Sequence, residues 1–408
     1  MNIVHTLLLI LCGILAVQLL FSLWNRTKLP LLGVPDGNKD CTADHTPGHT
    51  VDRTKGTRIS HINRDAKTTK TKISVLIPAR NEQIHIKDCV ESVLAADTEG
   101  IQLEVIVLND RSEDKTGEIL EQLATKDHRL RILEGKELPS GWMGKSYACH
   151  ELAQQATGEW WLYMDADVRL EKTALNAVLT TAQAQQKGLV TGFPRQITAT
   201  WLEKLVVPMM KFTIISHLPI VLVRGSQNPR FVAATGAFMF IHRDTYKATG
   251  GHEAIKADLL DDMQLARAVK KAGHPVTLAD VHRHTRTRMY QNAVEVWNGY
   301  KKNMYEGLGR SGFLLAGVLV MYAALYLLPP ISFLIGMFTG DFKVVALGAA
   351  GTLLGMLVKR VADLTGSHPF WLSLLHPVSI LFVIAIGISS WLGAVTGKGY
   401  VWKGRHYH

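Results

Sequence analysis

The sequence is poor in cysteine and lacks any spacing that would organise the few it has. Its 408 residues include 4 cysteines, Cys12, Cys41, Cys89 and Cys149, and no two of them form a C-x-x-C pair. Disulfide frameworks and cysteine-based zinc sites need paired or clustered cysteines, so neither is expected. We expect reduced thiols in a cytoplasmic setting, where structural disulfides are rare.

Acidic residues are scarcer than basic ones. The chain has 45 Lys+Arg against 35 Asp+Glu, a formal net charge of +10. The basic residues are mixed with acidic ones and gather beside uncharged segments, so a membrane surface explains the excess better than a nucleic acid does. We therefore expect no nucleic-acid partner. Hydrophobic residues make up 47% of the chain, which excludes disorder throughout.

Charge is absent from a long segment near the N-terminus. Ile3 to Trp24 contains no Lys, Arg, Asp or Glu and can cross a bilayer core of about 30 Å as a helix. No basic residue precedes it and no A-x-A cleavage site follows it, so it reads as an uncleaved anchor at residues 1–24. Arg26 and Lys28 follow directly, which predicts an outside N-terminus and a cytoplasmic continuation.

Three further uncharged segments occupy residues 311–397, namely Ser311 to Gly340, Val344 to Val358 and Leu364 to Gly397. The first and third are long enough to span, whereas the second is only about 22 Å long as a helix and could tilt, re-enter or form a hairpin. Two or three C-terminal spans are predicted. The basic tail at 398–408 favours an inside C-terminus, which three crossings would not give, so the number of crossings stays open. We expect a multi-pass plasma-membrane protein whose globular part is cytoplasmic.

The central part of the chain alternates between strand and helix patterns. Residues 25–72 are polar and basic with little apolar periodicity, which predicts a tether. Within 73–310, short apolar runs predict buried strands at Ile73–Pro78, Leu103–Leu108, Leu130–Leu133 and Trp160–Met164. Helical patterns separate these runs. This alternation predicts an α/β domain with a mostly parallel sheet.

Polar side chains follow three of the predicted strands. They belong to Pro78–Glu82, Asn109–Asp114 and Asp165–Asp167, and ligands bind at this edge of a parallel sheet. One such residue could be a helix cap, and Asp114 is explained equally well that way. Three together favour a site. Asp165 and Asp167 can share a divalent cation, Mg²⁺ or Mn²⁺, that bridges a diphosphate.

Several later residues are further candidates. Gly144-Lys145-Ser146 is no Walker A motif, because Pro139 stands where the first glycine is needed; Lys145 remains a candidate phosphate contact at a helix start. Asp261 and Asp262, at the start of another predicted helix, could satisfy the helix dipole or supply a general base. No metal-ligand spacing relates His252, His282 and His284, so we expect them to be structural.

In their order and spacing, these motifs resemble the family 2 glycosyltransferases, which have a GT-A nucleotide-diphospho-sugar fold. The matching pieces are Ser74–Glu82, Asn109–Thr116, Asp165–Asp167, Thr235-Gly236 with Gly250-Gly251, and Asp261-Asp262. The segments Gly141–Ser146, Arg288–Tyr290 and Trp297–Asn303 are similar to those of membrane-bound enzymes from hopanoid and carotenoid biosynthesis clusters. The resemblance implies a GT-A catalytic domain at 73–310 with flanking transmembrane helices.

The resemblance also implies roles for individual residues. It makes Asp262 the general base, with Asp261 beside it, and assigns Asp165 and Asp167 to the metal ion. It places the nucleotide-sugar donor on Pro78, Arg80, Glu82, Asp110, Asp114, Lys145, Asp165 and Arg288. Asn109 replaces the aspartate that is usual at the first position of its motif, so a carboxylate contact there is not expected.

The implied activity is inverting, metal-dependent transfer of a sugar to the hydroxyl of a membrane lipid, of isoprenoid or glycolipid type. The apolar stretch Thr200–Val223 could be an interfacial helix or part of the domain core. One alternative is a processive polysaccharide synthase, but the Q-x-x-R-W motif usual in those enzymes is absent. The other is an inactive membrane scaffold that binds nucleotide or lipid, and the carboxylates Asp165, Asp167 and Asp262 argue against it.

Overall fold

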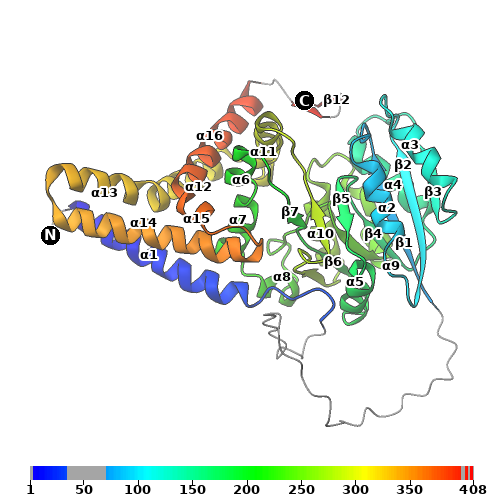
Figure 1. Cartoon of the computed structure of the whole chain (residues 1–408), viewed down its shortest axis with the longest axis horizontal. Coiled ribbons are helices and arrows are strands. Elements are labelled where there is room, and N and C mark those ends of the chain that lie inside the picture. The colour runs from blue at the N-terminus through cyan, green and yellow to red at the C-terminus, as the bar shows by residue number, and fades with distance from the viewer. Residues whose placement is uncertain (1–2, 35–69, 397–399, 403–404, 408) are drawn as a thin grey trace, which may run out of the picture.

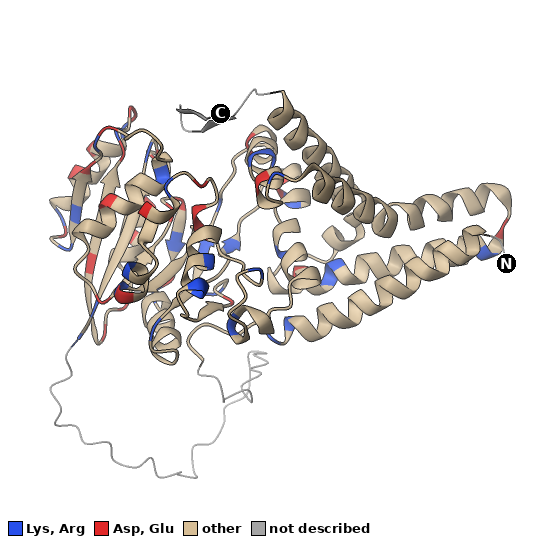
Figure 2. Cartoon of the chain, turned by 180° about the vertical axis from the view of Figure 1, so that it is seen from behind, with Lys and Arg blue, Asp and Glu red and all other residues tan. Residues whose placement is uncertain are grey.

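The computed structural model describes residues 3–34, 70–396, 400–402 and 405–407. An α/β domain forms one part of the molecule, and long helices extend away from it on one side (Figure 1). Charged residues gather on the α/β domain and near helix ends, while the long helices are almost uncharged along their length (Figure 2). The uneven charge of the sequence therefore corresponds to a division of the structure.

The α/β domain is built on a seven-stranded sheet with the order β3-β2-β1-β4-β8-β6-β9. The central strand β1 runs parallel to both neighbours, β2 and β4, and β8 alone is antiparallel to the strands beside it. The mostly parallel sheet predicted from the sequence is thus confirmed. The strands are β1 (Thr71–Ala79), β2 (Ile101–Asn109), β3 (Leu130–Glu134), β4 (Trp160–Tyr163), β6 (Leu189–Thr191), β8 (Met239–His242) and β9 (Val276–Leu278).

Helices cover both faces of this sheet. Successive side chains of β1 therefore point into two different hydrophobic clusters. Val75 and Ile77 lie in one hydrophobic cluster and Leu76 in the other, which is why the strand is a continuous apolar run. The connecting helices are α2 (Ile86–Leu94), α3 (Thr116–Ala124), α4 (Gly144–Gln155) and α5 (Ala174–Gln183). A second sheet of β5 (Val168–Leu170), β10 (Thr285–Thr287) and β7 (Arg195–Gln196) was not predicted, since its strands are too short to show periodicity.

Within the described residues, three helices are long and apolar enough to cross a membrane: α1 (Ile3–Arg26), α14 (Phe342–Thr365) and α16 (His376–Val395). Helices α1 and α14 lie side by side (Figure 1), and His5 Nε2 lies 3.0 Å from Asp341 Oδ2 at their distal end. The C-terminal ends of both helices therefore lie on the side of the α/β domain (Figure 1). Helix α16 is inclined steeply to this pair and packs against α11 (Ala293–Gly307) and α12 (Gly312–Tyr326).

The C-terminal helices differ from the prediction. Ser311–Gly340 is not one span, because the chain breaks at Leu327 into α12 and α13 (Leu328–Thr339). Pro329 and Pro330 follow this break, where their missing N–H groups are tolerated in the first turn of α13. The segment expected to be short is instead the full-length helix α14. It continues through Lys359 because that ammonium forms an ion pair with Asp363 within the helix.

The predicted tether begins as part of the folded structure. Asn25 Nδ2 donates to the carbonyls of Ile215 and Leu218, at 2.9 and 2.7 Å, and Leu31 forms a β-bridge with Asp280. Residues 25–34 are therefore held on the domain, whereas the rest of the predicted tether, residues 35–69, lies outside the described residues.

The stretch Thr200–Val223 forms three short helices rather than one interfacial helix. They are α6 (Trp201–Val206), α7 (Met209–His217) and α8 (Val221–Gly225). Phe212 and Ile215 of α7 are buried in the same cluster as residues of the sheet, and α7 also packs against α1 and α14. Part of α7 therefore belongs to the domain core, and its contacts with α1 and α14 place it where the α/β domain meets the apolar helices.

Candidate active site

A cavity of about 1730 Å³ opens at the carboxyl edge of β1, β2 and β4. It brings together nearly all residues that the sequence singled out for the site. Those on its wall are Pro78, Arg80, Glu82, Asp110, Asp114, Lys145, Asp165, Asp167, Asp261 and Asp262. Their convergence follows from the parallel sheet, which places the ends of sequence-distant strands at one edge.

Two strained turns form the rim of the cavity beside β1 and β2. Asn81 and Arg111 both have φ of 53°, in the left-handed region that is costly for residues other than glycine. The turns hold each other in place, because Asn81 Oδ1 accepts from the Glu113 amide at 2.9 Å and the Asn81 amide donates to Ser112 Oγ at 3.0 Å. Such strain persists only where neighbouring bonds enforce it, as at a binding site.

The candidate nucleotide contacts on this rim also make internal hydrogen bonds. Arg80 Nη1 donates to the carbonyls of Asp110 and Arg111, at 2.8 and 2.9 Å. Asp114 Oδ1 accepts from the Thr116 amide at 2.9 Å, at the start of α3, and Oδ2 accepts from the Gln83 amide at 3.1 Å. Asp114 therefore supports the helix start and lines the cavity, so its two interpretations are compatible.

Asn109, which replaces the usual aspartate, has a structural partner. Its Nδ2 donates to the Glu134 carboxylate at the end of β3, at 3.2 Å, and its Oδ1 accepts from the Ser112 amide at 3.3 Å. A carboxylate at position 109 would face Glu134 with like charge. The side-chain amide of Asn109 is thus a suitable hydrogen-bond donor for Glu134. The motif alone did not predict this contact.

Lys145 and Asp165 form an ion pair on the wall of the cavity. Lys145 Nζ lies 2.5 Å from Asp165 Oδ1. Burial opposes the charge of the ammonium, but the carboxylates of Asp165 and Asp261 outweigh it and raise the pKa of Lys145 well above its usual value. Lys145 therefore remains a cation in the site, able to contact a phosphate group.

Asp167 fits the cation site that the sequence predicted. Burial, with a further contribution from Asp165, raises the pKa of Asp167 to about 6. Its Oδ1 is buried and makes no hydrogen bond of normal geometry to the described residues, although the nearby Thr287 hydroxyl acts to lower the pKa of Asp167. A buried carboxylate oxygen without a donor is costly, and a hard divalent cation would relieve that cost.

Asp262 is held in place at the start of α10 (Asp261–Lys271). Its Oδ2 accepts from the Gly236 amide at 2.9 Å and its Oδ1 from the Met263 amide at 2.7 Å. Burial and the neighbouring carboxylate of Asp261 raise the pKa of Asp262 to about 6. A fixed carboxylate with a raised pKa suits the role of general base near neutral pH.

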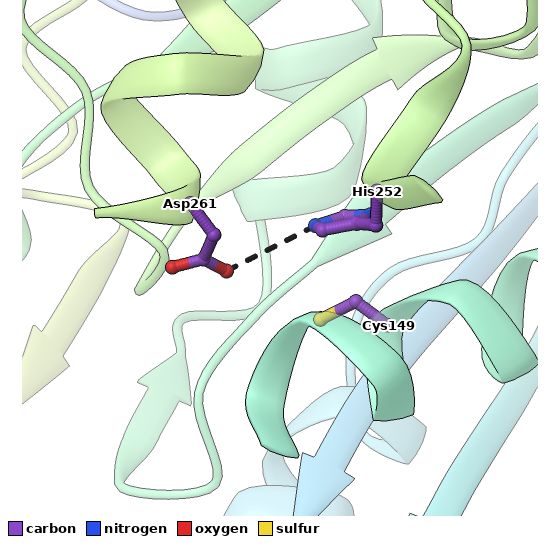
Figure 3. Close-up of side chains that lie close together, drawn as sticks. All are labelled: Cys149, His252 and Asp261. Atoms are coloured by element: carbon purple, nitrogen blue, oxygen red, sulfur yellow. Dashed lines mark ion pairs between the residues drawn. The ribbon is translucent and has the colours of Figure 1, made fainter. Parts of the chain in front are cut away.

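His252, which we expected to be structural, lies beside Asp261 (Figure 3). Its Nε2 is 3.9 Å from Asp261 Oδ2. The Tyr246 hydroxyl accepts from the His252 amide at 3.0 Å and lies 2.9 Å from His252 Nδ1, so it holds the imidazole ring in place. Burial and the charge of Lys145 lower the pKa of His252 to about 3. A neutral imidazole therefore lies beside Asp261.

Cys149 completes a buried cluster with these two residues. The ligating atoms of Cys149, His252 and Asp261 all lie within 4.8 Å of one another (Figure 3). Sulfur, nitrogen and oxygen ligands would suit zinc rather than magnesium, but burial raises the pKa of the Cys149 thiol well above its usual value, which disfavours the thiolate that zinc binds. The cluster has no sequence signature, because its members come from α4, the 3₁₀ helix η1 (Gly251–Ile255) and α10. His282 and His284 lie elsewhere, beside Asp280 and Thr173.

Arg288 is the one predicted site residue that does not line the cavity. Its guanidinium pairs instead with the buried carboxylate of Glu203, at 3.3 Å, and donates to the Gln291 carbonyl. Contact with a diphosphate would require this ion pair to break. Lys302 on α11, which the sequence reasoning did not single out, does line the cavity. Burial, with the charge of Lys145, lowers the pKa of Lys302 to about 8.

The cavity continues from the acidic edge into the helical part of the molecule. Its far wall is largely apolar and is formed by α7, α12 and α16. The apolar side chains on this wall include Met209, Ile214, Leu315, Val318, Leu319 and Val383. A polar site is thus joined without interruption to a surface suited to hydrocarbon.

The sheet and the acidic site at its edge define an α/β nucleotide-sugar transferase fold of the GT-A type. A mannosyltransferase from Pyrobaculum calidifontis, solved with GDP-Man and Mn²⁺, has this fold and matches with a TM-score of 0.57 at 16% identity, covering 95% of this chain and 99% of that one. Residues 74–250 match the model of glycosyl transferase family 2. This part of the α/β domain is therefore similar to the family 2 glycosyltransferases.

Two named relatives extend this comparison. A 4,4'-diaponeurosporenoate glycosyltransferase from Staphylococcus haemolyticus is 27% identical over 60% of this chain and 64% of its own length. A beta-monoglucosyldiacylglycerol synthase from Trichormus variabilis is 28% identical over 33% of this chain and 28% of its own length. In both cases the match spans less than two thirds of the relative.

Proposed function

We propose that this protein transfers a sugar from a nucleotide-diphospho-sugar to a hydroxyl group of a membrane lipid, with inversion at the anomeric carbon. The observation that carries the proposal is the continuous cavity, with carboxylates and Lys145 at one end and the apolar side chains of α7, α12 and α16 at the other. A nucleotide sugar suits the first end and a lipid suits the second. The names of the two relatives support an amphiphilic acceptor.

The chemistry follows from the fixed groups. Asp262, held by the amides of Gly236 and Met263, takes the proton of the acceptor hydroxyl as its oxygen attacks the anomeric carbon. A positioned base of this kind contributes about 10²–10⁴-fold in rate. The bond to the nucleoside diphosphate breaks on the opposite face. Lys145 offsets the negative charge that develops on the leaving phosphate.

A divalent cation, Mg²⁺ or Mn²⁺, would be held by Asp167 and Asp165. The buried Oδ1 of Asp167 supports this assignment. When bound, the cation supplies Lewis-acid stabilisation of the leaving diphosphate. Asp165 already contacts Lys145, so the two carboxylates would divide their charge between the ion and the lysine.

We further propose that the α/β domain faces the cytoplasm of a multi-pass plasma-membrane protein. Arg26 ends α1 at the side of the α/β domain, and basic residues at that end favour the cytoplasmic side. Protease treatment of sealed vesicles of both orientations tests this. Cleavage within the α/β domain is expected only in inside-out vesicles, and protection there would reverse the assignment.

The proposed activity is tested with membranes that contain the protein, incubated with a panel of nucleotide sugars. Mass spectrometry of the organic extract should reveal a lipid that gains one sugar mass. A labelled product that remains in the aqueous polymer fraction would instead indicate a processive synthase. Nucleotide-sugar binding without any transfer, to either fraction, would favour an inactive scaffold.

A further inference from the structure

We propose that the hydroxyl of Tyr290 donates a hydrogen bond to a phosphate oxygen of the donor's diphosphate, beside the cation that Asp167 and Asp165 would hold. The inference rests on the proposed function and adds a binding residue to the donor site, where the family resemblance assigned Arg288 instead. It is carried by the path of residues 288–291 along the acidic edge of the cavity.

This segment passes the acidic edge because of the strand that precedes it. Strand β10 pairs antiparallel with β5, and Thr287 lies opposite Val168. Val168 directly follows Asp167 in the chain. Because the two chains of an antiparallel pair run in opposite directions, the residues that follow Thr287 continue past Asp167. The topology therefore brings Tyr290 toward the proposed cation site.

The segment is anchored at both ends. Arg288 donates to the Glu203 carboxylate from Nε at 3.4 Å and from Nη2 at 3.3 Å. At the other end, the Gln291 amide donates to Glu295 Oε2 at 2.7 Å, and Gln291 Nε2 lies 3.4 Å from Nε2 of His85. His85 belongs to the chain that follows β1 and lines the cavity. The segment thus spans from the cation site to the edge where the nucleotide would bind.

The ring of Tyr290 has a place made for it on α11. A Cβ added at Gly299 would lie 2.5 Å from both Cε1 and Oη of Tyr290, so a larger residue would displace the hydroxyl. The ring also packs against Tyr300, with the ring centroids 5.9 Å apart. Tyr290 and Gly299 both line the cavity. Among the described residues, the Tyr290 hydroxyl has no hydrogen-bond partner.

The surroundings of Tyr290 favour a phosphate oxygen as that partner. Burial raises the pKa of Tyr290, and the charges of Asp167 and Glu295 raise it further. The hydroxyl therefore keeps its proton at neutral pH and is a donor. A diphosphate bridged to a cation at Asp167 would bring charged acceptor oxygens to this position, and hydrogen bonds to charged groups are the stronger kind. Because the ring is already held, binding would cost little side-chain entropy.

The test measures nucleotide binding to the full-length protein in detergent, with saturating Mn²⁺. Isothermal titration calorimetry compares UDP with UMP and GDP with GMP, so that each pair differs by one phosphate group. The variant Y290F removes only the hydroxyl. The control is Y147F, which alters a half-buried tyrosine of α4 that is not among the cavity-lining residues.

We expect the wild-type protein to bind the diphosphate of at least one base more tightly than the monophosphate. Y290F should raise Kd for that diphosphate by about 10- to 100-fold, the range for one hydrogen bond to a charged group. Its Kd for the monophosphate and its half-maximal Mn²⁺ concentration should stay unchanged. Y147F should behave like the wild-type protein, and melting temperatures without ligand show that the variants are folded.

A second variant tests the position of the ring. G299A forces the end of Tyr290 to move, so it should weaken diphosphate binding as Y290F does. The double variant should bind little worse than either single variant, because both remove the same contact. G317A, with no atom within 4 Å of its Cβ, is the control for an added helix methyl group and should bind like the wild-type protein.

Three results would overturn the inference while the proposed function stands. Unchanged diphosphate affinity in Y290F would remove the contact. An equal loss for monophosphate and diphosphate would assign Tyr290 to the nucleoside or to the fold. A higher Mn²⁺ requirement with unchanged nucleotide affinity at saturating Mn²⁺ would assign it to the cation. A wild-type protein that binds neither diphosphate more tightly than its monophosphate would contradict the proposed donor site itself, and the inference would fail with it.

Discussion

The backbone amide of Gly236 donates a hydrogen bond to Asp262 Oδ2 at 2.9 Å. The same glycine lies against Lys145, since a Cβ added at Gly236 would be 2.5 Å from Lys145 Nζ. Gly236 therefore helps to position both the candidate base, Asp262, and the candidate phosphate contact, Lys145. Any side chain at this position would disturb the lysine.

Replacement of the candidate base should separate binding from transfer. D262N keeps the shape of the side chain but cannot accept the hydroxyl proton. We expect its kcat to fall by about 10²–10⁴-fold, while the donor still shifts the melting temperature as it does in the wild-type protein. Turnover close to that of the wild-type protein would remove Asp262 from this role.

The rate should depend on pH through the same carboxylate. Burial and Asp261 raise the pKa of Asp262 to about 6, and the base works only when deprotonated. The ratio kcat/KM should therefore be constant above pH 6 and fall about tenfold per pH unit below it. An acid limb centred near the ordinary value of 3.8 would contradict the burial argument. With the cation at saturating concentration, which keeps Asp167 ionised, the residual activity of D262N should lack the limb at pH 6.

Metal removal should abolish transfer if Asp167 and Asp165 hold a cation. We expect EDTA to stop the reaction and added Mg²⁺ or Mn²⁺ to restore it, because the cation offsets charge on the leaving diphosphate. D167N should need a higher metal concentration for half-maximal rate, by about tenfold or more. A rate unaffected by EDTA would show that Lys145 alone serves the phosphate.

A methyl group at Gly236 should weaken the site without unfolding the protein. G236A forces the end of Lys145 away from Asp165, since the new Cβ would lie 2.5 Å from Nζ. Loss of a charged contact predicts a decrease in kcat/KM of about 10- to 100-fold. The control is G225A, because no atom lies within 4 Å of a Cβ at Gly225. Equal activity of the two variants would argue against a role for the Lys145 position.

The packing of the apolar helices can be tested in the same way. A Cβ at Gly348 of α14 would lie 2.5 Å from the backbone nitrogen of Phe333 on α13, and backbone cannot move aside cheaply. G348A should destabilise the protein by about 1–3 kcal/mol, measured by thermal denaturation in detergent. G317A on α12, with nothing within 4 Å of its Cβ, is the matched control and should melt like the wild-type protein.

The sequence by itself determined the sheet, the acidic edge and the apolar segments. Short apolar runs such as Ile73–Pro78 became β1 and its neighbours, and the carboxylates after them met in one cavity. These features are local patterns of polarity, and the topology of a parallel sheet then leaves little choice about where strand ends lie. The family resemblance followed from the same motifs and is confirmed by the match over residues 74–250.

Only the tertiary structure decided which distant side chains meet. His252 lies beside Asp261 because Tyr246 fixes its ring. Arg288 forms an ion pair with Glu203 instead of lining the cavity. Lys302 lines the cavity from helix α11, near the apolar region. The break at Leu327 and the length of α14 likewise depended on packing and on an ion pair. Such contacts join residues far apart in the chain, and no periodicity in the sequence encodes them.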